Sequence, residues 1–259
     1  MLKRLKQILV IINLKALLIT ALAILSTYIC ERFSLTAELP LTIIATAVVF
    51  PIVFSIGGAY KRREDALDEY GTIKAHGRAI YFAARDWLED PPESVLGEVR
   101  VLLGDLLMHC RQLFLDPPSK MRENEQDVYR QFSLVSRFIR NDLRQNGLAS
   151  GEVSRCNQYL SKMLIAFESI KHVYQYRTPK TLRAFSDFFI VLLPIIYGPH
   201  FAQMAKDSTG NLHYAMPVLL SVILVSLDNI QEHLENPFDQ IGEDDVCINA
   251  EKFVDSLAL

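Results

Sequence analysis

The hydrophobic residues of this chain are concentrated towards its two ends. Long apolar runs cover residues 8–30 and 39–60 in the first part, and residues 185–205 and 214–227 later on. About twenty apolar residues are enough for a helix to cross the hydrocarbon core of a bilayer. The pattern therefore predicts four transmembrane helices, the first two over about residues 14–31 and 39–60. The fourth run is short and reaches spanning length only if its helix continues past Asp228.

The second apolar run, residues 39–60, has an unusual composition for a simple anchor. It contains Thr42, Thr46, Pro51, Ser55 and two adjacent glycines. Small, polar and helix-breaking residues are tolerated at membrane depth where other protein or a water-filled cavity covers the backbone. The run therefore either packs closely against another helix or lines a pore.

Basic residues flank the predicted spans on one side. The amino terminus carries three of them, and Lys61, Arg62 and Arg63 follow the second span. The positive-inside rule then places the protein in the cell membrane as a multi-pass protein with both termini in the cytoplasm. Lys15, near the start of the first span, is expected to set topology by reaching the headgroups.

The middle of the chain has the periodicity of amphipathic helices and no strand alternation. Three stops interrupt it: one at Asp90-Pro91-Pro92, one at Asp116-Pro117-Pro118, and a turn marked by Asn146-Gly147 and Ser150-Gly151. Apolar residues recur at helical spacing between the stops, which predicts an antiparallel bundle. The predicted inward faces are Val95, Val99, Leu102 or Leu103, Leu106, Cys110 and Leu113; Val128, Phe132, Val135, Ile139 and Leu143; and Tyr159 or Leu160, Met163, Phe167, Ile170 and Tyr174.

These elements predict an all-α integral membrane protein made of four parts. Residues 1–60 form a first transmembrane hairpin, and residues 61–180 form a cytosolic helical bundle between spans 2 and 3. Residues 181–230 form a second hairpin, and residues 231–259 form an acidic cytosolic tail. The helix of the second span is expected to continue without a break towards Leu88.

Few residues suggest catalysis or metal binding. The four cysteines are scattered without CxxC spacing, and the six histidines are dispersed. No Walker, HExxH or GxSxG motif is present, so we expect no enzyme, and nothing indicates nucleic acid as a partner. The acidic loop with Asp239, Asp244 and Asp245 is a candidate cation site through its carboxylates, although a solvated acidic turn is the preferred interpretation.

Three blocks of the sequence resemble the bestrophin family of ion channels, in particular its bacterial branch. The second span ends in Ala59-Tyr60-Lys61-Arg62, and Thr178-Pro179 leads into a span that contains Pro194. The most specific block is LDNIQEHLENPFD at residues 227–239, which is similar to the family's helix end followed by Asn-Pro-Phe and acidic residues.

The resemblance implies a homopentamer in the lipid bilayer, with one axial pore for small inorganic ions. Aligning Tyr60 and Pro40 with the family places Leu39, Ile43 and Ala47 at the hydrophobic neck of the pore. Alanine is a departure, because the family usually has a large residue at that position. The constriction is therefore expected to be wider or displaced towards Phe50 and Phe54.

Two properties stay open at this point. The conducted ions are either monovalent anions such as chloride or monovalent cations. An apolar neck selects neither charge. The acidic tail would favour cations and the Lys61–Arg63 cluster would favour anions. No cofactor is expected, and calcium is not expected either, because bacterial members of the family generally lack the calcium site.

Three other classes of membrane protein are alternatives to a channel. The main alternative is a non-conducting scaffold whose cytosolic bundle recruits a partner, and Ala47 and Pro51 favour it. A membrane-embedded enzyme would need ionisable residues converging at membrane depth, where the spans supply little beyond Lys15. A secondary transporter would show more spans and internal repeats.

Overall fold

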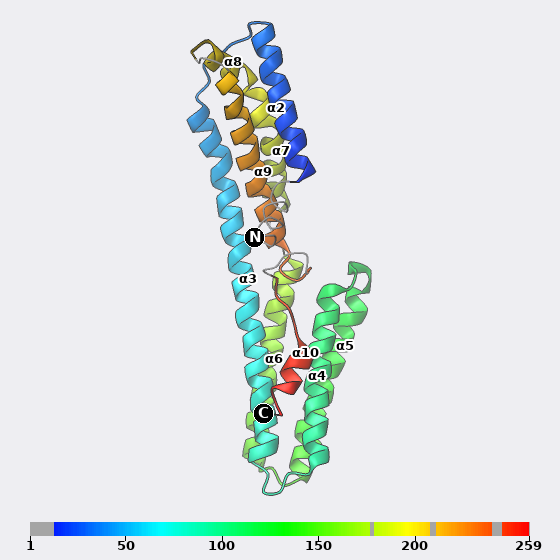
Figure 1. Ribbon diagram of the computed structural model, residues 1–259. Coiled ribbons are helices and arrows are strands. Elements are labelled where there is room, and N and C mark those ends of the chain that lie inside the picture. Colours follow the sequence, from blue (N-terminus) through cyan, green and yellow to red (C-terminus); the bar gives the residue numbers. More distant parts are fainter. Residues whose placement is uncertain (1–12, 177–178, 208–210, 240–244, 259) are drawn as a thin grey trace. The chain divides into compact units, whose positions relative to one another are not determined.

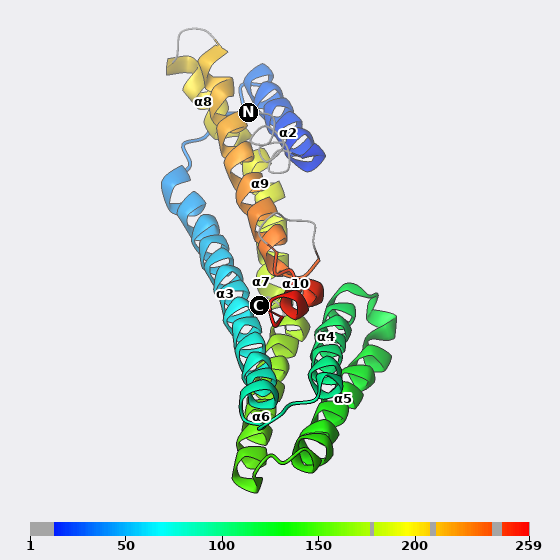
Figure 2. The same cartoon turned by 60° about the horizontal axis from the view of Figure 1, so that its bottom comes forward.

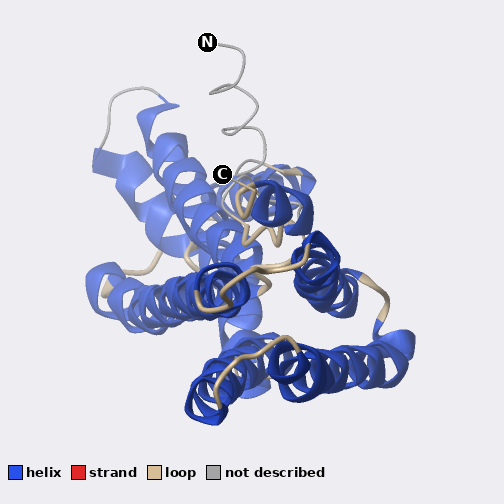
Figure 3. Cartoon of the chain, turned by 90° about the horizontal axis from the view of Figure 1, so that it is seen from below, coloured by secondary structure: helices blue, strands red, loops and turns tan. Residues whose placement is uncertain are grey.

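The computed structural model describes residues 13–176, 179–207, 211–239 and 245–258. All regular elements of these residues are helices, joined by short loops, and none of them is a strand (Figure 1 and Figure 3). The chain divides into two compact units. Residues 1–61 and 177–235 form one, called the membrane unit here, and residues 62–176 and 236–259 form the other, called the bundle unit.

The described residues of the membrane unit form five α-helical segments. They are α2 (Leu14–Arg32), the first part of α3 (Leu41–Asp86), α7 (Lys180–Ile196), α8 (Gly198–Asp207) and α9 (Ala215–Glu235), with the short helix η3 (Asn211–Tyr214) before α9. Within the described part of the chain, four stretches are long and apolar enough to cross a membrane: Leu14–Arg32, Leu41–Asp86, one within residues 150–204, and Ala215–Glu235. Their shared core includes Ile19, Val48, Ile52, Ile190, Leu193, Phe201, Leu224 and Val225.

The third apolar run is not one helix, which corrects the prediction for residues 185–205. The chain breaks between α7 and α8, and Gly198 occupies the first position after the break. A Cβ atom on Gly198 would lie 2.3 Å from Ser26 Oγ, so only glycine allows this close approach to α2. Pro199 follows in the first turn of α8, where its missing N–H costs no helical hydrogen bond.

Helix α3 continues from the membrane unit into the bundle unit, as predicted. It runs for 46 residues from Leu41 to Asp86 and contains Pro51. Its first residue is Leu41, so Leu39 and Pro40 precede the helix. The fourth span also continues past Asp228, to Glu235.

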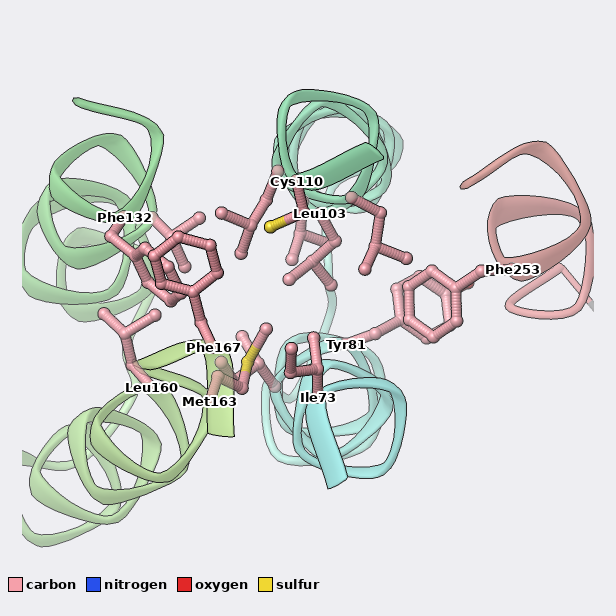
Figure 4. Close-up of a cluster of buried hydrophobic side chains, with 14 of the residues drawn as sticks. Ile73, Tyr81, Leu103, Cys110, Phe132, Leu160, Met163, Phe167 and Phe253 are labelled. Atoms are coloured by element: carbon pink, nitrogen blue, oxygen red, sulfur yellow. The ribbon is translucent and has the colours of Figure 1, made fainter. Parts of the chain in front are cut away.

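The bundle unit packs the second part of α3 against α4 (Glu93–Leu115), α5 (Met121–Phe138) and α6 (Ser150–Gln175), as Figure 2 shows. Two short helices, η1 (Pro118–Lys120) and the π-helical η2 (Ile139–Leu143), flank α5. The chain turns near all three predicted stops, because proline and glycine interrupt the helices there. Ser150 and Gly151, predicted to belong to the third turn, instead begin α6. The predicted inward residues form the core, with Leu102, Tyr159 and Tyr174 only partly buried (Figure 4).

The carboxyl-terminal segment completes the bundle core, which the sequence reasoning missed. Helix α10 (Ala250–Asp255) places Phe253 against the unit, with 4 % of that residue exposed (Figure 4). The Tyr70 Oη atom accepts a hydrogen bond from the backbone N–H of Asn249 at 3.0 Å. Arg111 binds both carboxylate oxygens of Glu251, at 3.0 and 2.9 Å. The tail is therefore an integral part of the bundle.

Candidate pore-lining face

One face of α3 is uncovered within the membrane unit. Ile43, Phe50 and Phe54 are 71 %, 60 % and 65 % exposed, whereas Val48 and Ile52 on the opposite face are 2 % and 0 % exposed. Residues three, four and seven positions apart share one side of a helix. The three large apolar side chains therefore form a continuous stripe, which we call the α3 stripe. No other described residue covers it.

Of the other two predicted neck residues, Ala47 lies on the α3 stripe and Leu39 does not. Ala47 is exposed and lies on the α3 stripe between Ile43 and Phe50. Leu39 precedes the helix, and its side chain is partly buried against the core of the membrane unit. The backbone N–H of Leu39 donates to His200 Nδ1 at 3.3 Å, which ties this residue to α8. Helical spacing therefore does not place Leu39 on the stripe.

The bulkiest part of the α3 stripe is the pair Phe50 and Phe54. Their ring centroids are 4.6 Å apart and their planes are nearly perpendicular. Edge-to-face packing of this kind is a favourable arrangement for two aromatic rings. The pair fixes the orientation of two large apolar side chains one and two turns beyond Ala47.

The small residues of this span play different roles. The Thr46 hydroxyl donates to the carbonyl oxygen of Thr42 at 2.6 Å, which satisfies it within the helix. Ser55 is buried, and its hydroxyl has no hydrogen-bond partner among the described residues. A Cβ atom on Gly57 would meet no atom within 4 Å. Packing within one chain therefore does not explain this glycine.

A buried ion pair connects α2 to α9 in the membrane unit. Lys15 Nζ lies 2.5 Å from Asp228 Oδ2, and the Asp228 side chain is fully buried. Arg183 of α7 binds Glu235 at 2.5 Å. The sequence led us to expect Lys15 at the headgroups, but the structure gives it a carboxylate partner 213 residues away. The only sequence signal was an acidic residue inside the fourth apolar helix.

The candidate cation loop is only partly described. Asp244 lies outside the described residues, whereas Asp239 and Asp245 lie within them and each has an interaction partner. The described residues contain no group of three or more histidine, cysteine or acidic side chains that could hold a metal ion. Next to this loop, Phe238 is 1 % exposed and stacks on Phe114, with ring centroids 4.7 Å apart. The Phe of the Asn-Pro-Phe block therefore anchors the tail in the bundle.

The bundle unit has an acidic groove between α3 and α6. It has a volume of about 770 Å³ and is lined by Asp65, Asp68, Glu69, Leu164, Ile165, Glu168, Ser169, His172 and Val173. Burial raises the pKa of Glu168, but hydrogen bonds from Lys171 and Tyr129 outweigh this effect and lower the pKa overall. The Glu168 carboxyl group is therefore ionised at neutral pH, and the groove carries negative charge.

Comparison with known proteins identifies the fold. No protein-family model and no curated protein matches the chain. Solved structures do: a singly substituted bacterial bestrophin homologue from Klebsiella pneumoniae has a TM-score of 0.75 and 19 % identity, with 95 % of this chain and 97 % of that one covered. A zinc-phased structure of the Klebsiella homologue has a TM-score of 0.71 and 17 % identity, covering 93 % of each chain.

A third structure, described as a membrane protein with one substitution, has a TM-score of 0.73 and 18 % identity, covering 94 % of this chain and 96 % of that one. The agreement extends over nearly the full length of the chain. The chain therefore has the fold of the bacterial bestrophin homologues. At this level of identity the similarity concerns the fold alone.

Proposed function

We propose that this protein is a bestrophin-like ion channel that conducts small monovalent ions through an axial pore. The observation that carries the proposal is the α3 stripe, a row of large apolar side chains that its own chain leaves uncovered. In a membrane helix that also contains Gly57 and Pro51, such a face fits a pore or a neighbouring subunit better than lipid alone. The bestrophin fold supports the same conclusion.

The assembly that fits this proposal is a homopentamer in the cell membrane. Five copies of α3 around one axis would turn the α3 stripes inward and enclose a continuous lumen. Both termini and the bundle unit would then lie in the cytoplasm, where the positive-inside rule places Lys61, Arg62 and Arg63. In this arrangement the α3 stripe faces the lumen and the neighbouring subunits, and no partner protein is needed to shield it from lipid.

The neck of this pore would be formed by Ile43, Phe50 and Phe54, with Ala47 widening it between them. Apolar constrictions gate by dewetting and do not select ions by charge. Charge selection must therefore come from elsewhere on the chain. Asp65 and Asp68 follow on α3 and are exposed, and they border the acidic groove. The opposing charge of Arg63 is paired with Glu64 at 2.5 Å. The carboxylates of Asp65 and Asp68 therefore favour cations over anions.

Two measurements on the purified full-length protein test the proposal. Its native mass in detergent should be five times the chain mass of 29.5 kDa. Recordings in planar bilayers should show unitary currents in symmetric potassium chloride. A protein that forms pentamers but never conducts above background would instead support the non-conducting scaffold. A monomeric protein would contradict the channel assembly itself.

A further inference from the structure

An apolar groove runs along α2 in the membrane unit. It has a volume of about 410 Å³ and is lined by Ala21, Ile24, Leu25, Tyr28 and Tyr214. Four of these residues lie on one side of α2, and Tyr214 comes from η3, immediately before α9. Figure 1 shows α2 beside α8 and α9. A groove lined by hydrocarbon and aromatic rings binds an apolar ligand.

The groove and the end of α2 beyond it together span about one bilayer leaflet. The lining residues from Ala21 to Tyr28 cover about 10 Å of the helix, and from Ala21 to Arg32 the helix rises by about 16 Å, at 1.5 Å per residue. A leaflet contributes about half of the roughly 30 Å hydrocarbon thickness. The end of α2 therefore reaches the headgroup level, while the groove extends towards the middle of the membrane. A single acyl chain fits this length.

A carboxylate with a free oxygen lies at the headgroup end of the groove. Glu31 Oε2 accepts a hydrogen bond from Tyr214 Oη at 2.6 Å and lies 3.3 Å from His213 Nε2. The other oxygen, Oε1, has no partner among the described residues, and 42 % of the Glu31 side chain is exposed. This oxygen is available to a cationic donor arriving from the membrane surface.

A basic residue directly follows Glu31 in the sequence. Arg32 is exposed and is the last residue of α2, four positions after Tyr28 and therefore on the groove side of the helix. It forms no ion pair with any described residue. Arginine binds phosphate oxygens through two parallel N–H groups. Glu31 and Arg32 together present one negative and one positive group at the end of an apolar groove.

We propose that this groove is a specific site for a phospholipid with a primary amine in its headgroup, of the phosphatidylethanolamine type. One acyl chain lies along Tyr28, Leu25 and Ala21. The headgroup phosphate binds Arg32, and the ammonium group donates hydrogen bonds to Glu31 Oε1. The charge pattern matches a zwitterionic headgroup, whereas an anionic lipid without an amine would leave Glu31 opposed to its negative charge. This site does not depend on conduction.

Native mass spectrometry of the full-length protein in detergent tests the site. The protein is incubated with equal amounts of phosphatidylethanolamine, phosphatidylcholine and phosphatidylglycerol, and the retained lipids are counted per chain. Phosphatidylethanolamine should be retained about three- to tenfold more than phosphatidylglycerol, since a charge-assisted hydrogen bond at a half-exposed site is worth this factor. Phosphatidylcholine should fall between them, because its quaternary ammonium cannot donate hydrogen bonds.

Substitutions at two positions, Glu31 and Leu25, separate the headgroup contact from the groove. Glu31→Gln should abolish the preference for phosphatidylethanolamine, and Glu31→Asp should restore part of it. Leu25→Trp should fill the groove and lower retention of all three lipids. The matched control is Leu22→Trp, because Leu22 is a similarly exposed leucine of α2, at 46 % against 52 %, that does not line the groove. Size-exclusion chromatography confirms that each variant is folded.

Three outcomes would overturn the proposal. The first is an unchanged lipid preference in Glu31→Gln together with unchanged lipid retention in Leu25→Trp, which would show that the retained lipid binds elsewhere. The second is a change of native mass in Leu25→Trp without a change in lipid retention. That result would make the groove a contact between subunits. Equal effects of Leu25→Trp and Leu22→Trp would also count against a specific site.

Discussion

At the scale of single residues, the most consequential feature is the burial of charge in the membrane unit. Asp228 is fully enclosed, and only Lys15 neutralises it at hydrogen-bonding distance. One of its two carboxylate oxygens, Oδ1, has no partner among the described residues. An unpaired charge in this position would be costly, so the pair holds α2 and α9 in one register.

Replacing Lys15 with methionine should destabilise the protein, because it leaves the buried Asp228 without its hydrogen-bonded counter-charge and with only the more distant Arg183 to oppose it. The expected loss is roughly 2–3 kcal/mol, at the low end for a buried pair since Lys15 is partly exposed. The thermal midpoint in detergent should fall by about 5–10 °C. Lys120→Met, at a more exposed lysine of the bundle unit, should change it little. Equal shifts in the two variants would contradict a special role for Lys15, and Asp228→Asn should partly rescue Lys15→Met.

The cysteines should differ widely in reactivity. Burial raises the pKa of the Cys110 thiol to about 12 and that of the Cys156 thiol to about 11. Only the thiolate reacts, so both groups stay protonated and unreactive between pH 7 and 9, and they become reactive only as the pH approaches the raised pKa values. Cys247 is exposed. Iodoacetamide at pH 8 should therefore label Cys247 at least about 100-fold faster than Cys110, measured by peptide mass spectrometry.

Comparable labelling rates at all sites would contradict this prediction. The control is Cys247→Ser, which should remove the fast phase completely and leave the thermal midpoint unchanged.

At the scale of elements, α3 carries both features on which the proposed function rests. Its inward face builds the core of the membrane unit, and its uncovered face carries the α3 stripe. Beyond the stripe, the same helix borders the acidic groove of the bundle unit. A single 46-residue helix thus supplies both the proposed neck and the charges proposed to select ions.

Replacing Ile43 with alanine should alter conduction and leave assembly intact. The side chain is 71 % exposed, so its removal opens no cavity in the core. A smaller apolar residue widens a dewetting constriction, and unitary conductance should rise about twofold or open probability should increase. Phe188→Ala, at an exposed residue of α7, is the control and should conduct like the unmodified protein. Unaltered currents in Ile43→Ala would remove this residue from the neck.

Neutralising the exposed carboxylates of α3 should weaken cation preference. The double substitution Asp65→Asn and Asp68→Asn removes two negative charges per chain without changing side-chain size. In a tenfold potassium chloride gradient, the reversal potential should move towards zero by roughly 10 mV or more, because a charged vestibule concentrates counter-ions. Asp90→Asn, at an exposed residue in the loop after α3, should leave it unchanged. A reversal potential that does not move would place the selectivity elsewhere.

At the scale of the whole molecule, the carboxyl-terminal tail is anchored in the core of the bundle unit. The Asn-Pro-Phe block leaves α9 and inserts Phe238 into the bundle core, and α10 then closes the same core with Phe253. The residues between them include the candidate cation loop. Hydrophobic burial therefore anchors the described part of the tail on both sides of that loop.

A chelator should leave channel activity unchanged if the tail is anchored by hydrophobic contacts alone. Currents recorded in bilayers with and without a calcium chelator should be equal in amplitude and open probability. A clear loss of current on chelation, reversed by added calcium, would show that Asp239 and Asp245 take part in a functional cation site. The matched control is the double variant Asp239→Asn and Asp245→Asn, which should then have lost its response to the chelator.

The sequence by itself determined where the helices lie and which faces are apolar. The bundle helices, their proline- and glycine-rich stops and the continuous α3 were all predicted, because helical periodicity and chain breaks are local properties of the chain. The predicted core positions, such as Val99 and Phe167, were buried for the same reason.

The tertiary structure alone decided which distant residues meet. The Lys15–Asp228 pair, the close approach of Gly198 to Ser26 and the docking of α10 each join segments more than 100 residues apart. The groove beside Glu31 likewise needs Tyr214 from a separate helix. No periodicity along the chain encodes such contacts, because they depend on how the helices pack and not on how each one forms. Packing also decided that Leu39 rests against the core, while Ile43 stays uncovered.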